Sequence, residues 1–324
     1  RDETMKVEKI LLIPSGNGAD QPGIDRVSVF AGPGTEVEVF EPVFDSSLET
    51  YPLENSKDID QLREGLVEEY RRRAGEMAGE LSKRGLTASG IAAWDYPASD
   101  AIVRRALETE ADLVVTESLS GRIGTLSQAD WRLISRCPVP LLLVRSEAKP
   151  NYDRILAAVD PFHEHGKPPE LDEAILDAAK FARDATDAKL EVIHCFVPLS
   201  SIAQGADLAH LPIDDAEESL AAYRHDALVE LVENAGIPAD AARIEKGYPA
   251  RVLHALVGPG DIGLVIMGGL SRGRIRDFLL GSTAERLIHD SPADILIIKP
   301  PGFTTTVADH MTEPPIIAPI YYPF

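Results

Sequence analysis

The sequence predicts an α/β fold of two tandem domains, each a doubly wound, five-stranded parallel sheet with helices on both faces. Short apolar runs typical of buried parallel strands alternate with longer segments of helical periodicity along the chain. Such alternation favours right-handed crossovers and a sheet covered on both sides. The pattern occurs twice in one register, and 324 residues at 44% apolar composition are enough for two cores.

The repeat divides the chain into two domains and a tail. We place the first domain at residues 5–147, the second at 153–300 and an extended apolar tail at 301–324. The boundary is expected in the polar stretch from Glu147 to Asn151, which a proline interrupts.

Each domain is expected to alternate strands and helices. In the first domain we expect strands near 9–14, 36–44, 87–93, 112–116 and 140–145, and helices near 59–84, 97–109 and 127–135. In the second domain we expect strands near 154–159, 189–197, 241–246, 263–268 and 294–299, and helices near 169–185, 214–235, 249–257 and 282–290. Matching motifs align the two sets, since Tyr96-Pro97-Ala98 and Tyr248-Pro249-Ala250 each precede a predicted helix.

One stretch of the second domain carries the features of a phosphate site. The apolar run Leu264–Met267 ends in Gly268-Gly269, and Gly281-Ser282-Thr283 opens a later segment of helical spacing. Glycines allow a ligand to approach the backbone, and the free N–H groups of a helix N-terminus suit a phosphate. Arginines at 272, 274 and 276 add positive charge. The stretch therefore predicts a nucleotide phosphate site.

The spacing Gly268-x2-Ser271-x9-Gly281-Ser282 resembles the signature of the universal stress protein family, whose members bind the ribose and phosphates of ATP with it. Ser271 stands where the ATP-binding branch has a second glycine. The resemblance covers both halves, and the tandem arrangement is most similar to the tandem-domain, E-type branch of the family. It implies an adenine-nucleotide fold, stress-induced expression, and regulatory work as a homodimer. It also implies ATP, with magnesium, as the ligand.

The resemblance also assigns site residues. By position, Asp160 would face adenine or ribose, and Cys195 and Met267 would line the adenine pocket. The residues that would hold ribose and phosphates are Gly268, Ser271, Gly281, Ser282 and Thr283. The topology independently brings Asp160 and Gly268 to one crevice, because ligands of doubly wound sheets bind beyond the carboxyl ends of the strands. In the family the final strands pair across a dimer, whereas here the strands near 140–145 and 294–299 could pair within one chain.

The first domain differs at the matching positions. Glu117 stands in place of Gly268, Ser127-Gln128 in place of Gly281-Ser282, and Ser15 in place of Asp160. A carboxylate at Glu117 would repel a phosphate. We therefore predict that the first domain binds no nucleotide there.

Composition excludes several classes. A net charge of −21 disfavours a nucleic-acid partner, because nucleic-acid binding needs a basic face. No apolar run approaches the roughly 20 residues that cross a bilayer, so we expect a cytoplasmic protein without a membrane span. Cys137 and Cys195 are too few for a disulfide framework.

Rival interpretations remain open. A scaffold of the same fold that binds no nucleotide is favoured by Ser271. A serine hydrolase could use Gly269-Leu270-Ser271-Arg272-Gly273 as a nucleophile elbow, but a loop rather than a helix follows it. His163-x-His165 with His194 could ligate zinc, but a solvated loop is the better interpretation, because an HxH pair without a defined third ligand is unspecific. We identify no general base, catalytic lysine or metal carboxylate pair, so enzymatic activity is limited to slow ATP hydrolysis.

The tail after Pro301 has scattered prolines and no lasting period, so it should be extended. Its isoleucines and aromatic residues are too apolar for an inert segment. We predict that it docks on an apolar groove of its own chain or of a second copy.

Overall fold

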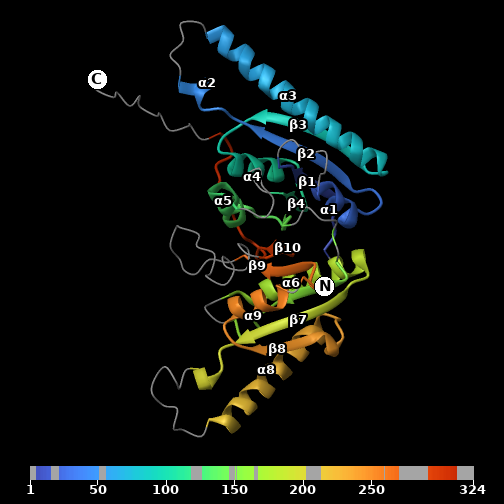
Figure 1. Cartoon of the computed structure of the whole chain (residues 1–324), viewed down its shortest axis with the longest axis vertical. Helices are drawn as coiled ribbons and strands as arrows, with labels where there is room; N and C mark the ends of the chain where they lie inside the picture. The colour runs from blue at the N-terminus through green and yellow to red at the C-terminus, as the bar shows by residue number, and fades with distance from the viewer. Residues whose placement is uncertain are drawn as a thin grey trace, which may run out of the picture.

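The computed structural model describes residues 5–15, 22–50, 56–117, 126–145, 150, 152–163, 167–201, 213–258, 260–269 and 291–311. These residues form one ten-stranded sheet in the order β3-β2-β1-β4-β5-β10-β9-β6-β7-β8. The first five strands in sequence belong to one half of the molecule and the last five to the other, and the halves lie end to end along the longest axis (Figure 1).

The first half alternates strands and helices as predicted, with two additional helices. Its elements are β1 (Lys9–Ile13), α1 (Pro22–Phe30), β2 (Glu36–Val43), α2 (Ser47–Thr50), α3 (Ser56–Lys83), β3 (Thr87–Trp94), α4 (Ala98–Glu108), β4 (Leu113–Thr116), α5 (Gln128–Arg136) and β5 (Leu141–Leu143). The sequence analysis did not predict α1 or α2. Helix α1 has only nine residues, but Pro22 at its first position has the fixed φ that a helix start favours.

The second half repeats this order. Its elements are β6 (Arg154–Ala158), α6 (Pro169–Thr186), β7 (Lys189–Phe196), α8 (Asp214–Asn234), the 3-10 turn η2 (Ala239–Ala241), β8 (Ala242–Lys246), α9 (Pro249–Val257), β9 (Leu264–Gly268) and β10 (Asp294–Ile298). The helix predicted near 282–290 lies outside the described residues.

Within each half all neighbouring strands are parallel, and the halves meet through one antiparallel pair. Leu142 of β5 lies opposite Leu296 of β10 in that pair. The prediction that these two strands pair within one chain is therefore confirmed. The pairing joins the two units into a single sheet and covers two edges that would otherwise be exposed.

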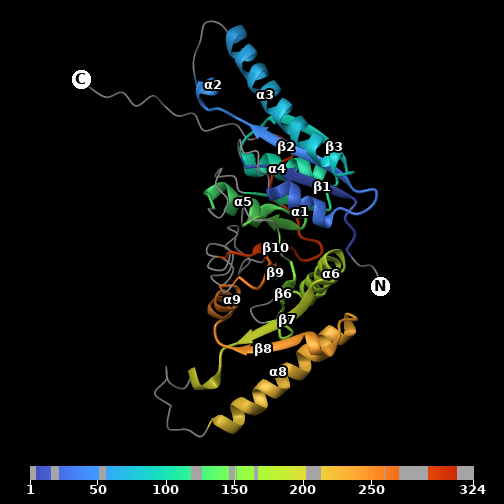
Figure 2. The ribbon, with the colours of Figure 1, turned by 45° about the vertical axis from the view of Figure 1, so that its right-hand side comes forward.

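Two apolar clusters cover the faces of the sheet, and both run through the two halves. One cluster lies beneath α1, α3, α6 and α8, and includes Val27, Ala74, Ile175 and Leu228. The other lies beneath α4, α5 and α9, and includes Ile102, Leu133 and Leu253. Figures 1 and 2 show the long helices α3 and α8 at opposite ends of the molecule. The core is thus a continuous three-layer α/β/α arrangement.

The chain after β10 crosses onto the first half. Val307 packs against the apolar cluster beneath α4, and a side chain of α4, Arg104, donates to the carbonyls of Ala308 (3.2 Å) and His310 (3.1 Å). This segment, drawn in red, runs past α5 and α4 in Figure 1. Residues 301–311 therefore lie against the opposite half of their own chain. The predicted domain limits, 5–147 and 153–300, stay predictions.

Candidate functional site

The candidate site lies where the strand order of the second half reverses. Strands β6 and β9 are adjacent and parallel, with Ala158 opposite Met267. Helix α6, which follows β6, and helix α9, which precedes β9, pack on opposite faces of the sheet. Carboxyl ends of parallel strands at such a point form a crevice in doubly wound folds. Asp160 follows β6, and Gly268 ends β9, so the structure brings these two predicted residues to the same edge.

Asp160 is held by two neighbouring side chains, Asp172 and Lys167. Its backbone N–H donates to both carboxylate oxygens of Asp172 (3.2 and 3.1 Å), and its Oδ2 accepts from Lys167 Nζ (3.0 Å). The residue is only 7% exposed, and its Oδ1 is buried without a hydrogen-bond partner in the part of the chain that the structure describes. A buried acceptor of this kind is costly unless a donor reaches it.

Asp172 supports Asp160 from the first turn of α6. Burial raises the pKa of the Asp172 carboxyl above its usual range, the backbone N–H of Asp160 lowers it, and the nearby Asp160 carboxylate raises it again. Two acidic groups are therefore packed side by side at the end of β6, with Lys167 as the compensating cation.

Met267 and Cys195 lie on the other face of the sheet. Both belong to the cluster beneath α9, which also contains Val252 and Leu256. Burial, together with the nearby charge of Glu245, raises the pKa of the Cys195 thiol to about 12, so the side chain is a neutral thiol. These two side chains pack in the apolar cluster of this face.

Gly268 faces the α6 side of the sheet instead. A Cβ at this position would lie 2.7 Å from Leu171 Cδ2, closer than real contacts allow. Close packing of β9 against α6 is thus one reason for a glycine here.

The remaining predicted site residues lie outside the described residues, namely Ser271, Gly281, Ser282, Thr283 and the three arginines between them.

A buried lysine contacts the start of that segment. Lys299, at the end of β10, donates from Nζ to the carbonyl of Gly269 (2.8 Å) and to that of Ser135 (3.5 Å). Burial lowers the pKa of this lysine to about 8. No local sequence pattern predicts the role of Lys299, because its partners are separated from it by many residues along the chain.

At the matching position of the first half, a carboxylate occupies the hydrogen-bond donors. Glu117, which follows β4, is 4% exposed. Its Oε2 accepts from the backbone N–H (3.1 Å) and hydroxyl (2.8 Å) of Ser15, and its Oε1 accepts from the N–H of Gly23 (2.6 Å). Gly23 is in the first turn of α1, where N–H groups are free to bind an anion. The side chain of Glu117 therefore holds the donors that an external anion would need.

His194 of β7 has both ring nitrogens engaged. Nε2 lies 2.9 Å from Arg224 Nη1, and Nδ1 lies 3.3 Å from the carbonyl of Val159. An arginine can only donate, so Nε2 accepts and Nδ1 carries the proton. The guanidinium of Arg224 also lies over the rings of Phe162 (4.6 Å) and Phe196 (5.2 Å). His194 is thus a neutral packing histidine.

The zinc interpretation gains no support from the described residues. Among them, no group of three or more histidine, cysteine, aspartate or glutamate side chains is arranged to hold a metal ion. His165, one of the three suggested ligands, lies outside the described part of the chain.

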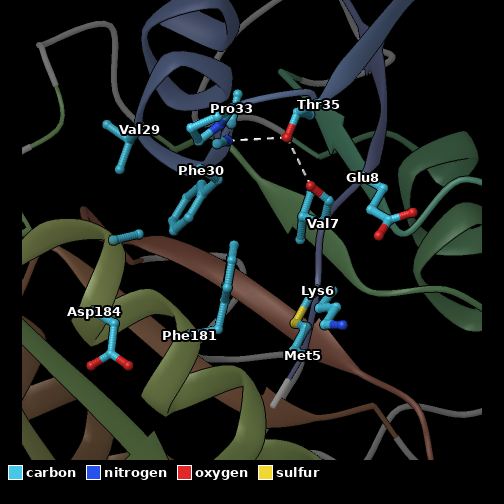
Figure 3. Close-up of a pocket in the computed structure, with 13 residues that line it drawn as sticks. Met5, Lys6, Val7, Glu8, Val29, Phe30, Pro33, Thr35, Phe181 and Asp184 are labelled. Atoms are coloured by element: carbon cyan, nitrogen blue, oxygen red, sulfur yellow. Dashed lines mark hydrogen bonds between the residues drawn. The ribbon is translucent and has the colours of Figure 1, made fainter. Parts of the chain in front are cut away.

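A cavity of about 450 Å³ lies away from the crevice, between the two halves (Figure 3). Phe30 at the end of α1 and Phe181 of α6 face it, together with Met5 before β1. Thr35 closes one wall by donating its hydroxyl to the carbonyl of Val7 (2.8 Å) and accepting from the N–H of Gly32 (3.0 Å). Because this cavity lies near the amino ends of β1 and β2, it is separate from the site at the carboxyl ends of β6 and β9.

Comparison with known proteins agrees with this architecture. The sequence profile of the Universal stress protein family matches residues 151–299. The chain is 31% identical over 149 residues to universal stress protein A of Yersinia pestis, covering 45% of this chain and 91% of that protein. The chain belongs to the universal stress protein family. It is also 24% identical over 307 residues to universal stress protein E of Escherichia coli K12, covering 93% of this chain and 96% of that protein.

Solved structures extend the likeness to the full length of the fold. A protein of unknown function from Pseudomonas aeruginosa PAO1 superposes with a TM-score of 0.66 at 20% identity, covering 91% of this chain and 94% of that one. A universal stress protein from Archaeoglobus fulgidus gives a TM-score of 0.63 at 20% identity, covering 91% and 99%. The sequence comparisons confirm the predicted family and the similarity to its E-type members, and the solved structures confirm the fold class.

No helix among the described residues has the length and apolar character needed to cross a membrane.

Proposed function

We propose that this universal stress protein is a stress-response regulator whose second half binds an adenine nucleotide, in the first place ATP with magnesium. The observation that carries the proposal is the contrast between the two crevices. In the first half the position after β4 is Glu117, whose carboxylate uses the N–H groups of Ser15 and Gly23. In the second half the matching position is Gly268, from which no side chain can enter the crevice.

The second crevice also offers groups suited to a nucleoside. Asp160 presents a buried oxygen, Oδ1, with no hydrogen-bond partner among the described residues. A ribose hydroxyl or an adenine amino group is a donor that would satisfy it. On the other face of the sheet, Met267 and Cys195 supply apolar surface of the kind that purine rings pack against.

The phosphates would be held by the following segment. We propose Gly268, Ser271, Gly281, Ser282 and Thr283 for this role, because glycines and the N-terminus of a helix suit phosphate. Arg272, Arg274 and Arg276 would add positive charge in a chain whose net charge is −21. Magnesium would bind chiefly to the phosphate oxygens, as is usual for this ion.

Equilibrium dialysis with labelled ATP and magnesium tests the proposal. Asp160→Ala should weaken binding at least tenfold, since losing one charged hydrogen bond costs about 1.5–3 kcal/mol. The control is Asp309→Ala, which removes a fully exposed carboxylate from the segment after β10 and should leave binding unchanged. Equal affinity in the wild-type chain and the Asp160 variant would overturn the assignment of Asp160.

The alternative function is a scaffold that acts through protein contacts alone. Two observations favour it: Ser271 replaces a glycine of the ATP-binding pattern, and residues 301–311 already use the first half as a docking surface. If ATP, ADP and UTP all fail to bind or to raise the melting temperature, the scaffold becomes the better account. We further propose a cytoplasmic homodimer without nucleic-acid partners, which sedimentation equilibrium and a DNA-binding assay would check.

A further inference from the structure

The ten-stranded sheet has two edges, and they differ in chemistry. Strand β8 forms one edge and carries three charged residues, of which Arg243 binds Glu245 (2.7 Å) and Lys246 binds Glu217 of α8 (2.9 Å). Strand β3 forms the other edge, is eight residues long and contains no charged residue. Charges and shortness protect an edge strand from pairing, whereas a long uncharged edge invites another strand. The edge at β3 therefore lacks the charges that protect β8 from pairing with another strand.

The outward backbone groups of β3 are defined by its pairing with β2. The N–H of Asp95, directly after β3, donates to the carbonyl of Val43 of β2 (3.0 Å). Because backbone groups alternate in direction along a strand, residues at even positions point their N–H and C=O away from β2. These residues are Ala88, Gly90, Ala92 and Trp94. In the part of the chain that the structure describes, no strand pairs with this outer side.

Strand β3 is also held in place by packing against α3 and by contacts of Trp94. A Cβ at Gly90 would lie 2.3 Å from the backbone carbon of Ala74, so β3 packs directly on the backbone of α3. At the end of the strand, the ring of Trp94 packs against Phe44, with centroids 5.5 Å apart, and beneath the guanidinium of Arg63 at 5.2 Å. A rigid, preformed strand loses little conformational freedom when another strand is added to it.

One arginine binds both the C-terminal segment and the end of β3. Arg104 of α4 binds the carboxylate of Asp95 (3.0 and 2.5 Å), at the end of β3, and the carbonyls of Ala308 and His310 (3.2 and 3.1 Å). A single side chain, that of Arg104, therefore connects the segment that ends at Met311 with the end of β3. The 13 residues that follow, 312–324, could extend about 40 Å at 3.3 Å per residue, more than the length of the eight-residue strand β3.

The sequence of residues 312–324 has the pattern of a strand that pairs on one side only. It reads TEPPIIAPIYYPF, and from position 315 onward its prolines, 315, 319 and 323, all stand at odd positions. In an extended chain the odd residues point their backbone groups to the same side, so the proline nitrogens, which cannot donate, all face one way. The even positions, 316, 318, 320, 322 and 324, keep their N–H groups on the other side. Proline is tolerated in edge strands in this orientation alone.

We propose that residues 316–323 add to β3 of their own chain as an antiparallel edge strand. The tail leaves from the end of β3 and must run back along it, which gives the antiparallel direction. Its even residues meet the outward groups of Ala88, Gly90, Ala92 and Trp94, and its prolines face solvent. The addition covers the uncharged edge, and the outward prolines prevent any further strand from pairing.

Amide hydrogen exchange of the full chain, resolved to single residues by NMR, tests this arrangement. The N–H groups of Ala88, Gly90, Ala92 and Trp94 should exchange at least tenfold more slowly in the full chain than in a chain that ends at Met311. Both chains keep the contacts of Arg104, so the comparison isolates residues 312–324.

Two proline variants provide a matched pair. Ile320→Pro removes an N–H from an even position and should restore fast exchange of the β3 amides. Ile317→Pro replaces the same residue type at an odd position and should leave them protected. Ile320→Ala, which keeps the N–H, controls for the lost side chain and should retain most of the protection.

Three results would overturn the proposal. One is equal exchange of β3 in the full and shortened chains, and another is the same behaviour of the two proline variants. The third is protection that disappears on dilution together with a dimer, because the tail would then occupy the edge of a second copy.

Discussion

Arg26 of α1 and Asp294 of β10 form a buried ion pair that joins the two halves of the molecule. Arg26 Nε lies 2.8 Å from Asp294 Oδ2, and each side chain is 2% exposed. The Asp294 carboxylate also accepts from the hydroxyl of Tyr152 (2.5 Å) and from the N–H of Arg145 (2.7 Å). Because Arg26 belongs to the first half and Asp294 to the second, the antiparallel strand pair is reinforced by a charged contact on one side of the sheet.

Arg26→Met should destabilise the whole chain by about 3–5 kcal/mol, because it leaves the Asp294 carboxylate buried without its cation. Urea unfolding followed by circular dichroism measures this change. Arg71→Met, which breaks an exposed ion pair with Glu68 on α3, is the matched control and should cost less than about 1 kcal/mol. Similar losses in the two variants would show that the buried pair does not hold the halves together.

Gly90→Ala should destabilise the first half by about 2–3 kcal/mol, because its Cβ would meet backbone atoms of α3 that cannot move independently. Gly75→Ala provides the contrast. It lies in α3 at a place where a Cβ meets nothing within 4 Å, so it should stabilise the protein by about 0.5–1 kcal/mol. Thermal unfolding of both variants measures the two effects, and a tolerated Gly90→Ala would contradict the close packing of β3 on α3.

Glu41 of β2 gives the protein a pH-dependent stability. Burial raises the pKa of its carboxyl from 4.5 to about 7, Arg73 lowers it and Glu117 raises it. The folded state therefore keeps a proton that the unfolded chain releases above about pH 4.5. The stability that this proton provides is lost as the pH rises to about 7, by at most about 3 kcal/mol at 1.36 kcal/mol per pKa unit.

Glu41→Gln tests this effect, since its amide cannot ionise. The variant should be more stable than the wild type at pH 8 and should lose that advantage at pH 4.5. Urea unfolding at both pH values measures the difference. If the wild-type chain instead gained stability relative to the variant between pH 4.5 and 8, the predicted direction of the pH dependence would be wrong.

Local patterns in the sequence predict the elements, whereas contacts between distant residues decide the details of the site. Alternating apolar runs were enough to predict ten strands, and the family resemblance suggested the pairing of β5 with β10. The repeat also singled out Glu117 as a carboxylate in the first crevice. It did not predict α1, because a helix of nine residues gives a weak periodic signal.

The buried charges could not be predicted. Lys299 binds carbonyls of Gly269 and Ser135, which lie 30 and 164 positions away, and no local pattern relates them. Arg26 and Asp294 are 268 positions apart. In the sequence such residues look like ordinary polar positions at the ends of elements, and only the packed fold shows that they are buried and paired.

The central claim, one nucleotide site in the second half and none in the first, is tested most directly by calorimetric titration of the full chain with ATP and magnesium. Ser282→Asp places a carboxylate at the proposed phosphate turn, and Gln128→Asp places one at the matching exposed position at the start of α5. We predict binding with a stoichiometry near one that Ser282→Asp abolishes and Gln128→Asp leaves intact. Binding that survives Ser282→Asp, or its absence from the wild-type chain, would contradict the claim.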